Sequence, residues 1–419
     1  MYLLPIHVPI YVDGEAKFVT TEWWRALQLL RDSFNGHFGD IVVAAPKLPV
    51  GVVEPDQNLA TVPRDCGIEL TESFDLRCRA REFWSRERPQ WHRKLMALTA
   101  RAEIVHAGLD DVYRPIAFEG FRVGLLLGKV TVFVQDTDIV LQQRQLNEHG
   151  RAAQRMRARA YGWIFERMCR WSVARADLSL LKGTALMSRY GAYARNAKEF
   201  HDTSFYARDI VQAERLERRL ATLAASRALR LVYCGRLTER KGLKLSLEIV
   251  ARTIGLGAQL QFDIIGSGPE RASLEQMAAS LGIADRVSFI GALPYDASLI
   301  SRLGGYDGLL FTPTAEDTPR MIFDGYAAGL PVIASGIPYV EERHRQEHAA
   351  VVLPPGQVES SATAVAELCR NPQALIPLSR AARKAAEYHS AESWYARRAQ
   401  WTMEAAERRQ RQAVVPAAA

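Results

Sequence analysis

The sequence predicts an α/β protein of two domains, each an open parallel sheet covered by helices on both faces. The first observation is size, because 419 residues with 48% hydrophobic and 24% charged suffice for two globular cores. The second is that, from Leu229 onward, short apolar runs alternate with amphipathic segments of helical length. The third is that the first half repeats this alternation less cleanly. Both halves are therefore expected to be Rossmann-like.

The apolar runs of the second half have strand length and end in Gly, Pro or Ser. Strands that alternate with helices become parallel, because each helix carries the chain back across the sheet. The expected strands are LRLVYCG, QLQFDIIG, RVSFIG, DGLLFTP, LPVIAS and AAVVLPP, and the helices between them cover 242–254, 269–281, 295–303, 319–328 and 358–370.

The first half is expected to contain the strands YLLPIHVPI, DIVVAAP, AEIVHA, KVTVFVQD, DLSLLKG and AKEFHD, with an early helix over 23–34. A polar segment before residue 227 marks the connection between the halves. We therefore expect a first domain over 1–226, a second over 227–388, and a C-terminal helical segment with a tail over 389–419 whose helix returns to the first domain. Ligands of such sheets bind beyond the carboxyl ends of the strands.

Several classes of protein are excluded. The first residues have no basic segment and no small-residue cleavage site, so they are interpreted as a strand and not as an export signal. The apolar stretch 123–134 is shorter than the roughly 20 residues of a spanning helix. Five scattered cysteines suit a reducing cytoplasm, and no His, Cys and Asp spacing indicates a metal site. A net charge of +7 over this length does not predict nucleic-acid binding.

Two positive charges follow the first strand of the second half, in YCGRLTERKG. Gly235 permits a tight exit from the strand, and Arg236 and Lys241 would lie at the ligand-binding edge. A guanidinium holds two phosphate oxygens at once, and an ammonium neutralises a departing diphosphate. The alternative is an ordinary solvated loop.

The next strand ends in IIGSGPE, a glycine turn that opens the helix expected at Pro269. Gly266 and Gly268 would let the backbone approach a phosphate at the helix N-terminus. The alternative is a close turn from strand to helix.

The segment FTPTAEDTPRMIFDGYAAGLPVIAS has two acids around a short helix. Thr318 is a suitable N-cap and Pro319 a suitable first helical residue, so we expect a helix over 319–328. Glu316 would reach sugar hydroxyls, and Asp324 would accept hydrogen bonds from ribose hydroxyls. The alternative is that Glu316 and its neighbour Asp317 only favour the positive helix end, by about 0.3 to 1 kcal/mol each.

These motifs, in this order, resemble the second domain of family 4 glycosyltransferases. The resemblance rests on GRLxxxKG, on GSGP, and on two acids separated by seven residues before GLPVIAS, over roughly 229–354. It implies the GT-B fold and transfer of a sugar from a UDP- or GDP-sugar with retention at the anomeric carbon, without metal or cofactor. It also implies that Arg236 and Lys241 hold the diphosphate, Glu316 the transferred sugar and Asp324 the ribose.

The sequence departs from the family at several positions. The second acid is usually glutamate, and Asp324 is one methylene shorter. The residues that follow the first acid, usually glycines and a phenylalanine, are here Asp317, Thr318 and Pro319, and they are expected to contact the donor.

In the first half, Gly14 is the one glycine near the first strand that is available to approach the donor. Where the family often has a histidine, this chain has Gln135, Asp136 and Asp138. The Gln135 amide would hydrogen-bond a sugar hydroxyl and Asp136 would orient an acceptor, and the alternative is the ordinary polarity of a strand end. His201 ends the last strand at the same expected edge, and its alternative role is a strand-end hydrogen bond.

Seven arginines between Arg151 and Arg175 are interleaved with aromatic residues. This segment could lie on an anionic membrane at the inner face, where the acceptor would be lipid-linked. The alternative is a scaffold helix with its rings in the core and its charges in water.

Three functions therefore remain open from the sequence. The first is a cytoplasmic glycosyltransferase that acts on a glycan or lipid-linked glycan of the cell envelope or of an exopolysaccharide. The second is a nucleotide-sugar epimerase, and the third a catalytically silent nucleotide-sugar-binding scaffold.

Overall fold

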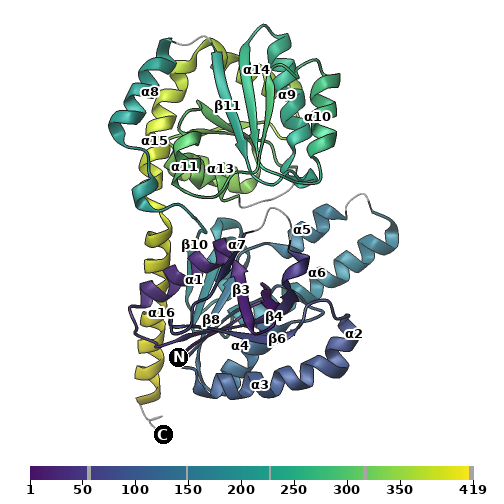
Figure 1. Cartoon of the computed structure of the whole chain (residues 1–419), viewed down its shortest axis with the longest axis vertical. Helices are drawn as coiled ribbons and strands as arrows, with labels where there is room; N and C mark the ends of the chain where they lie inside the picture. Colours follow the sequence, from purple (N-terminus) through teal and green to yellow (C-terminus); the bar gives the residue numbers. More distant parts are fainter. Residues whose placement is uncertain (54–57, 148–149, 226–227, 315–318, 415–419) are drawn as a thin grey trace. The chain divides into compact units, whose positions relative to one another are not determined.

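The computed structural model describes residues 1–53, 58–147, 150–225, 228–314 and 319–414 and divides into two compact units (Figure 1). One unit comprises Met1–His201 and Trp394–Ala419, and the other Asp202–Ser393. The division therefore falls before Asp202 and not at the expected residue 226. The reason is helix α8 (Ala213–Ala225), whose Leu216, Leu220 and Leu223 are buried in the core of the second unit.

The second unit has a parallel sheet in the order β13-β12-β11-β14-β15-β16. Neighbouring strands run in register, for example Leu231 opposite Phe262. The strands are nearly continuous apolar runs, because both faces of the sheet are covered. They are β11 (Ala228–Cys234), β12 (Gln259–Ile265), β13 (Val287–Gly291), β14 (Gly308–Phe311), β15 (Val332–Ser335) and β16 (Ala350–Leu353).

Helices pack on both faces of this sheet. Helices α9 and α14 contact each other, and so do α12 and α15. The helices of this unit are α8, α9 (Leu243–Gly255), α10 (Arg271–Ser280), α11 (Ala297–Leu303), α12 (Met321–Ala327), α13 (Pro338–Glu347), α14 (Val358–Arg370) and α15 (Leu375–Tyr388).

Some helix boundaries differ from the expectation. Helix α10 starts at Arg271 and not at Pro269, because Pro269 and Glu270 form a turn. Helix α12 starts at Met321, with Arg320 in the N-cap position, and Pro319 precedes it. Thr318, the expected cap, lies outside the described residues together with Glu316 and Asp317.

The sheet of the first unit has the order β10-β9-β8-β7-β1-β4-β2-β3-β5, with β6 also paired to β4. Its central strands are parallel, whereas β3 is antiparallel to β2 and β5. The strand expected at the start of the chain is therefore two strands, β1 and β2, and β2 forms a hairpin with β3. The strands are β1 (Tyr2–Pro5), β2 (Ile10–Asp13), β3 (Ala16–Thr20), β4 (Ile41–Pro49), β5 (Leu59–Thr61), β6 (Ile68–Asp75), β7 (Ile104–Gly108), β8 (Val130–Gln135), β9 (Leu178–Lys182) and β10 (Ala197–Phe200).

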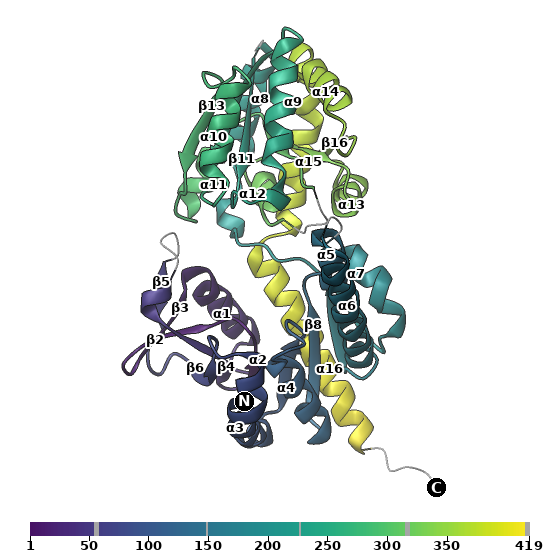
Figure 2. The ribbon, with the colours of Figure 1, turned by 90° about the vertical axis from the view of Figure 1, so that its right-hand side faces the viewer.

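Alternate residues of these strands serve two cores. Val132 and Leu180 pack with the C-terminal helix α16 (Ala391–Val414), whereas Phe133 and Leu181 pack with α6 (Ala152–Val173). Figure 2 shows α6 and α16 flanking β8. The C-terminal helix thus returns to the first unit, as expected. The other helices of this unit are α1 (Thr21–Phe34), α2 (Ala80–Glu82), α3 (Arg88–Arg101), α4 (Ile116–Leu126), α5 (Ile139–Leu146) and α7 (Gly183–Tyr190).

Among the described residues, no helix is both long enough and apolar enough to cross a membrane.

Candidate functional site

The loop after β11 is bonded to the loop after β12 at the carboxyl end of the second sheet. The Leu237 amide donates to the Ser267 carbonyl at 2.8 Å, and the Glu270 amide donates back to the Leu237 carbonyl at 3.2 Å. A Cβ on Gly266 would lie 1.9 Å from the Gly235 carbonyl oxygen, and one on Gly268 would lie 2.3 Å from that of Leu237. Both positions therefore require glycine for the two loops to approach this closely.

The other end of the same loop is bonded to the residues after β14. Gly242 is left-handed (φ +69°), and a Cβ on it would lie 1.7 Å from the Thr312 carbonyl oxygen. The Thr312 hydroxyl donates to the Gly242 carbonyl at 2.9 Å and lies 2.7 Å from the Ser246 hydroxyl. The Thr314 amide donates to the Arg240 carbonyl at 3.1 Å. Three neighbouring strands thus hold one rigid loop.

This loop presents the two expected cations. Arg236 is exposed, and its carbonyl accepts a hydrogen bond at 2.9 Å from the buried Tyr233 hydroxyl. Lys241 is half-buried, with its Nζ 5.7 Å from the centroid of the Phe311 ring. The structure therefore brings both residues to the carboxyl edge of the sheet, where an anionic ligand would meet them.

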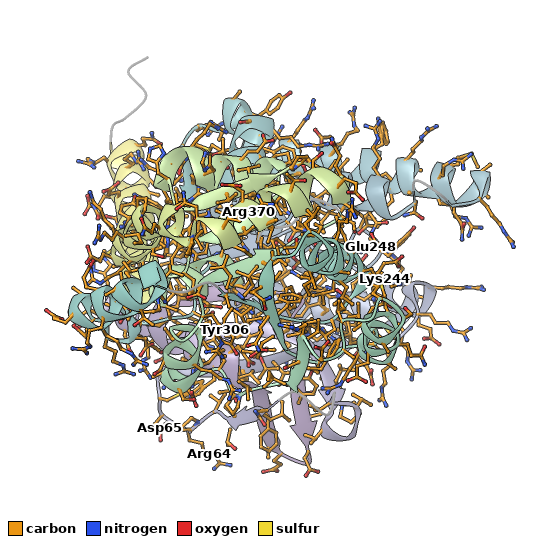
Figure 3. All side chains as sticks on the ribbon, turned by 90° about the horizontal axis from the view of Figure 1, so that it is seen from above. Arg64, Asp65, Lys244, Glu248, Tyr306 and Arg370 are labelled. Carbon is orange, nitrogen blue, oxygen red and sulfur yellow. The ribbon has the colours of Figure 1, made fainter. Side chains whose placement is uncertain are left out.

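One further cation flanks the loop from α9. The Lys244 Nζ lies 3.0 Å from a Glu270 carboxylate oxygen, which neutralises it. Figure 3 labels Lys244 with Glu248, four residues further along the same helix.

The second predicted acid, Asp324, lies in α12 against the same strand edge. Its side chain is 6% exposed, and Oδ1 accepts a hydrogen bond from the Tyr295 hydroxyl at 2.5 Å. Burial raises the pKa of the Asp324 carboxyl to about 6, although the Tyr295 bond and the charge of Arg320 oppose the rise. Burial, with the Asp324 charge added, also raises the pKa of the Cys234 thiol to about 12.

Tyr295 was not predicted as a site residue. Burial and the contact with Asp324 raise the pKa of its hydroxyl well above the usual value, so it stays protonated and donates. The sequence feature that could have identified it is its position, four residues after the end of β13 and just before α11. A tyrosine hydroxyl at the carboxyl end of a parallel strand can form hydrogen bonds at this edge of the sheet, as the predicted acids can.

Of the predicted residues in the first unit, Gly14 has a turn to explain it. It lies between β2 and β3 in a two-residue hairpin turn with φ +56°, and no atom within 4 Å would meet a Cβ there. The turn alone accounts for the glycine. Its expected approach to the donor stays a prediction.

Gln135 and Asp136 do lie at the end of β8. The Gln135 side chain is 2% exposed and its Nε2 donates to the Thr137 carbonyl at 3.0 Å, whereas its Oε1 has no partner among the described residues. Asp136 is exposed. Asp138, two residues further along the chain, caps α5 and pairs with Arg189 at 2.9 Å, so it has a structural role.

His201 is buried in the first unit. Its ring meets Trp394 edge to face with centroids 5.3 Å apart, and its Nε2 lies 3.3 Å from Glu199. These contacts match the strand-end alternative. His106 is also buried, beside the Tyr2 hydroxyl.

Two further residues of this edge were missed, His7 after β1 and Asp110 after β7. Although Asp110 is exposed, the surrounding protein displaces enough water to raise the pKa of its carboxyl to about 7. The Asp136 charge adds to the rise, and a hydrogen bond from the His7 backbone opposes it. Burial lowers the pKa of the His7 imidazole. The signal was the acid pair that follows AEIVHAGL, directly after a strand.

Known proteins resemble this chain in part and in whole. Residues 217–388 match the family model described as "Glycosyl transferases group 1". The 2-deoxystreptamine glucosyltransferase of Streptomyces kanamyceticus is 28% identical over 152 residues, which are 36% of this chain and 39% of that protein. The amylovoran biosynthesis glycosyltransferase AmsK of Erwinia amylovora is 26% identical over 174 residues, 39% of this chain and 42% of that one. The chain thus spans less than half the length of these curated relatives.

Solved structures resemble the whole chain. Anabaena Alr3699/HepE in complex with UDP superposes with a TM-score of 0.65 and 13% identity, covering 96% of this chain and 99% of that one. WaaG, a glycosyltransferase involved in lipopolysaccharide biosynthesis, gives 0.64 and 12% over the same shares of the two chains. The fold is therefore GT-B, with two Rossmann-like α/β units.

Proposed function

We propose that this protein is a glycosyltransferase that moves a sugar from a nucleoside diphosphate sugar to a glycan acceptor. The observation that carries the proposal is the loop from Gly235 to Gly242. It presents Arg236 and Lys241 at the carboxyl edge of a parallel sheet and is bonded to both neighbouring strand ends. A loop bonded at both ends holds its charges ready for a diphosphate, which is how preorganised electrostatics stabilise a leaving group.

The roles follow from charge and position. Arg236 and Lys241 neutralise the departing diphosphate. Asp324 accepts hydrogen bonds from the ribose through Oδ2, because Tyr295 already occupies Oδ1. Glu316, outside the described residues, contacts the transferred sugar.

The chemistry we propose is that of family 4, with retention at the anomeric carbon and without a metal. The donor phosphate oxygen accepts the proton of the attacking acceptor hydroxyl on the face from which the diphosphate leaves. A UDP-sugar is the first donor to test, since the HepE structures contain UDP and UDP-glucose.

The acceptor side of the proposal lies in the first unit. Asp110 and Asp136 end adjacent parallel strands, and their carboxylates would accept hydrogen bonds from acceptor hydroxyls. Relatives named for amylovoran and for lipopolysaccharide core biosynthesis favour a growing cell-envelope or exopolysaccharide glycan. We propose a lipid-linked glycan at the cytoplasmic face of the membrane.

The test is thermal stabilisation by UDP-, GDP- and ADP-sugars. A ligand present at about 100 times its Kd stabilises the folded state by about 2.7 kcal/mol. We expect a rise in Tm with one nucleotide class for the wild type and for Lys244→Ala, and none for the double variant Arg236→Ala, Lys241→Ala. Lys244 is the matched control because it is an exposed cation beside the same loop.

Turnover then separates the alternatives. Transfer to a glycan acceptor supports the proposal. Isomerised donor without acceptor indicates an epimerase, and binding without turnover indicates a silent scaffold. A wild type that no nucleotide sugar stabilises contradicts the proposal.

A further inference from the structure

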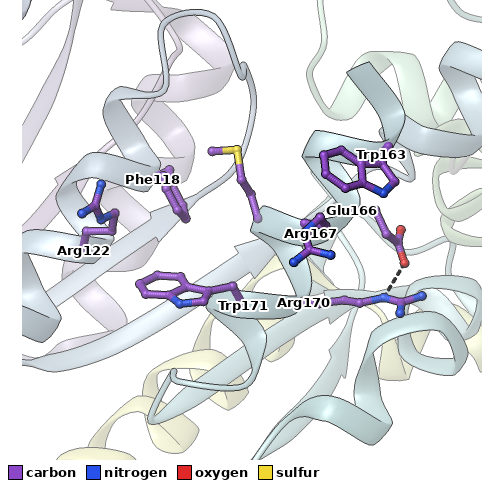
Figure 4. A pocket seen from close by; sticks show the side chains of 8 residues that line it. Phe118, Arg122, Trp163, Glu166, Arg167, Arg170 and Trp171 are labelled. Atoms are coloured by element: carbon purple, nitrogen blue, oxygen red, sulfur yellow. Dashed lines mark hydrogen bonds and ion pairs between the residues drawn. The ribbon is translucent and has the colours of Figure 1, made fainter. Parts of the chain in front are cut away.

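One exposed face of the first unit combines basic and apolar side chains. It consists of the outer residues of α4 and α6 and is called the α4–α6 surface. A hollow of about 800 Å³ opens in it. Figure 4 shows the hollow with arginines and aromatic rings around it. Its lining residues are Phe118, Arg122, Trp163, Glu166, Arg167, Met168, Arg170 and Trp171.

The charge of this surface is almost entirely positive. Residues 151–175 contain seven arginines and a single acid, Glu166. That acid is fully engaged, since it pairs with Arg170 at 2.7 Å and Arg189 at 2.8 Å and accepts a hydrogen bond from Tyr190. The other arginines of the segment are exposed. The surface is therefore complementary to a dense layer of negative charge.

Large apolar side chains stand among these arginines. Trp163 is 63% exposed and Met156 68%. Met156 and Trp163 are seven residues apart, so they share one face of α6. Arg167 lies over the Trp163 ring at 5.1 Å.

The core of the first unit does not need the side chains of Met156 and Trp163. The opposite face of α6 buries Phe165, Cys169 and Val173, each at most 1% exposed. Trp171 packs inward against Phe118 with centroids 5.6 Å apart. The helix thus already has a complete buried face, and Met156 and Trp163 add apolar area on the side that faces water. The scaffold alternative explains Phe165 and Trp171 but not these two.

We propose that the α4–α6 surface docks on a bilayer of anionic phospholipid. The exposed arginines, Arg122 and Arg167 of the hollow among them, then lie at the headgroups, and Trp163 and Met156 enter the acyl boundary. Nucleic acid fits less well, because the exposed Met156 side chain gains nothing from a phosphate backbone. The inference does not depend on the proposed transferase activity.

The experiment is flotation of the full chain with vesicles of phosphatidylcholine alone and with phosphatidylglycerol added. We expect binding only to the anionic vesicles, weakened by salt. Each arginine near the surface contributes about fivefold to partitioning, so the double variant Arg122→Gln, Arg167→Gln should lose about 25-fold. Trp163→Ala should weaken binding at constant charge.

Matched controls exist in the chain. Tyr388 is an aromatic side chain 56% exposed on α15 of the second unit, so Tyr388→Ala should leave vesicle binding unchanged. Arg208, with 81% of its side chain exposed, serves the same purpose for charge. The Tm of each variant without ligand reports folding, and its rise with the donor sugar reports the nucleotide site separately.

Three results would overturn the inference. The first is equal binding to neutral and anionic vesicles. The second is vesicle binding that the three substitutions leave unchanged. The third is a loss of duplex DNA binding, but not of vesicle binding, in the arginine variants, which would identify nucleic acid as the partner.

Discussion

The Tyr295 hydroxyl donates a hydrogen bond to the Asp324 carboxylate across the carboxyl edge of the second sheet. Tyr295 follows β13 and Asp324 lies in α12, so two segments meet that the sequence separates by 29 residues. The bond holds a buried carboxylate at the place where a ribose is expected. It also sets the proton affinity of that carboxylate, which makes it testable.

We expect Tyr295→Phe to raise the pKa of Asp324 above about 6, because the hydrogen bond to the ionised form is lost. If ionised Asp324 accepts the ribose hydroxyls, donor binding strengthens as pH rises through this pKa. The midpoint of the binding profile should therefore shift to higher pH in the variant. Calorimetric titration of the donor from pH 5 to 8 measures it. A pH profile identical to that of the wild type would mean that Tyr295 does not influence donor binding.

Asp324→Asn tests the same carboxyl through stability. Its pKa is about 6 in the folded state against 3.8 when exposed, so the protonated form is favoured by folding. The stability it contributes is present below about pH 4 and is lost as pH rises through 6, by at most about 3 kcal/mol. The asparagine variant should lack this loss. Urea unfolding of both proteins across that pH window checks it. If the free energy of unfolding depends on pH in the same way in both proteins, the burial of the Asp324 carboxyl is contradicted.

Gly242→Ala should destabilise the second unit and weaken donor binding. The new Cβ meets the Thr312 carbonyl, and the left-handed backbone adds about 1 to 2 kcal/mol. Gly257→Ala is the control, since its φ is +83° and no atom lies within 4 Å. We expect Gly242→Ala to cost about 1 to 3 kcal/mol more than the control in urea unfolding. Equal losses would mean that the loop can move away.

Arg343→Met should be strongly destabilising. The Arg343 side chain is 1% exposed and pairs with Glu342 and, at 2.5 Å, with Glu347. Removing it takes the guanidinium from two buried carboxylates, although Glu347 keeps His389 at 3.0 Å, and we expect a loss of about 3 to 5 kcal/mol. Arg345→Met, exposed on the same helix α13, should change the free energy of unfolding by less than about 0.5 kcal/mol. Similar changes in the free energy of unfolding for both variants would contradict a stabilising role for the ion pairs of Arg343.

His106 should make the first unit sensitive to acid. Burial lowers the pKa of its imidazole to about 3. The unfolded chain binds the proton near pH 6.5, so stability is lost as pH falls from 6.5 toward 3. His106→Gln should reduce this loss, and the exposed His37→Gln should not. Denaturant unfolding at pH 7 and pH 5 measures this loss. An unchanged pH dependence of stability in His106→Gln would contradict the prediction.

The sequence predicted the second unit better than the first. Each strand from LRLVYCG to AAVVLPP was recognised because strands covered on both faces are apolar throughout. The hairpin of β2 and β3 and the strand β5 were missed, because strands this short carry little periodicity, and β6 was missed because polar residues interrupt its apolar pattern. Helix α13 was missed too, since its buried polar residues Glu342 and Arg343 have no apolar pattern.

At the candidate site, the sequence by itself determined which residue types follow each strand, and hence Arg236, Lys241 and Asp324. Strand ends are local in the chain, and parallel strands place their carboxyl ends at one edge. Only the tertiary structure decided which groups touch. The pairing of Tyr295 with Asp324, the need for glycine at 242, 266 and 268, and the burial of His201 depend on contacts between segments far apart in sequence. Close packing of separate loops, unlike periodicity, leaves no mark that a single segment carries.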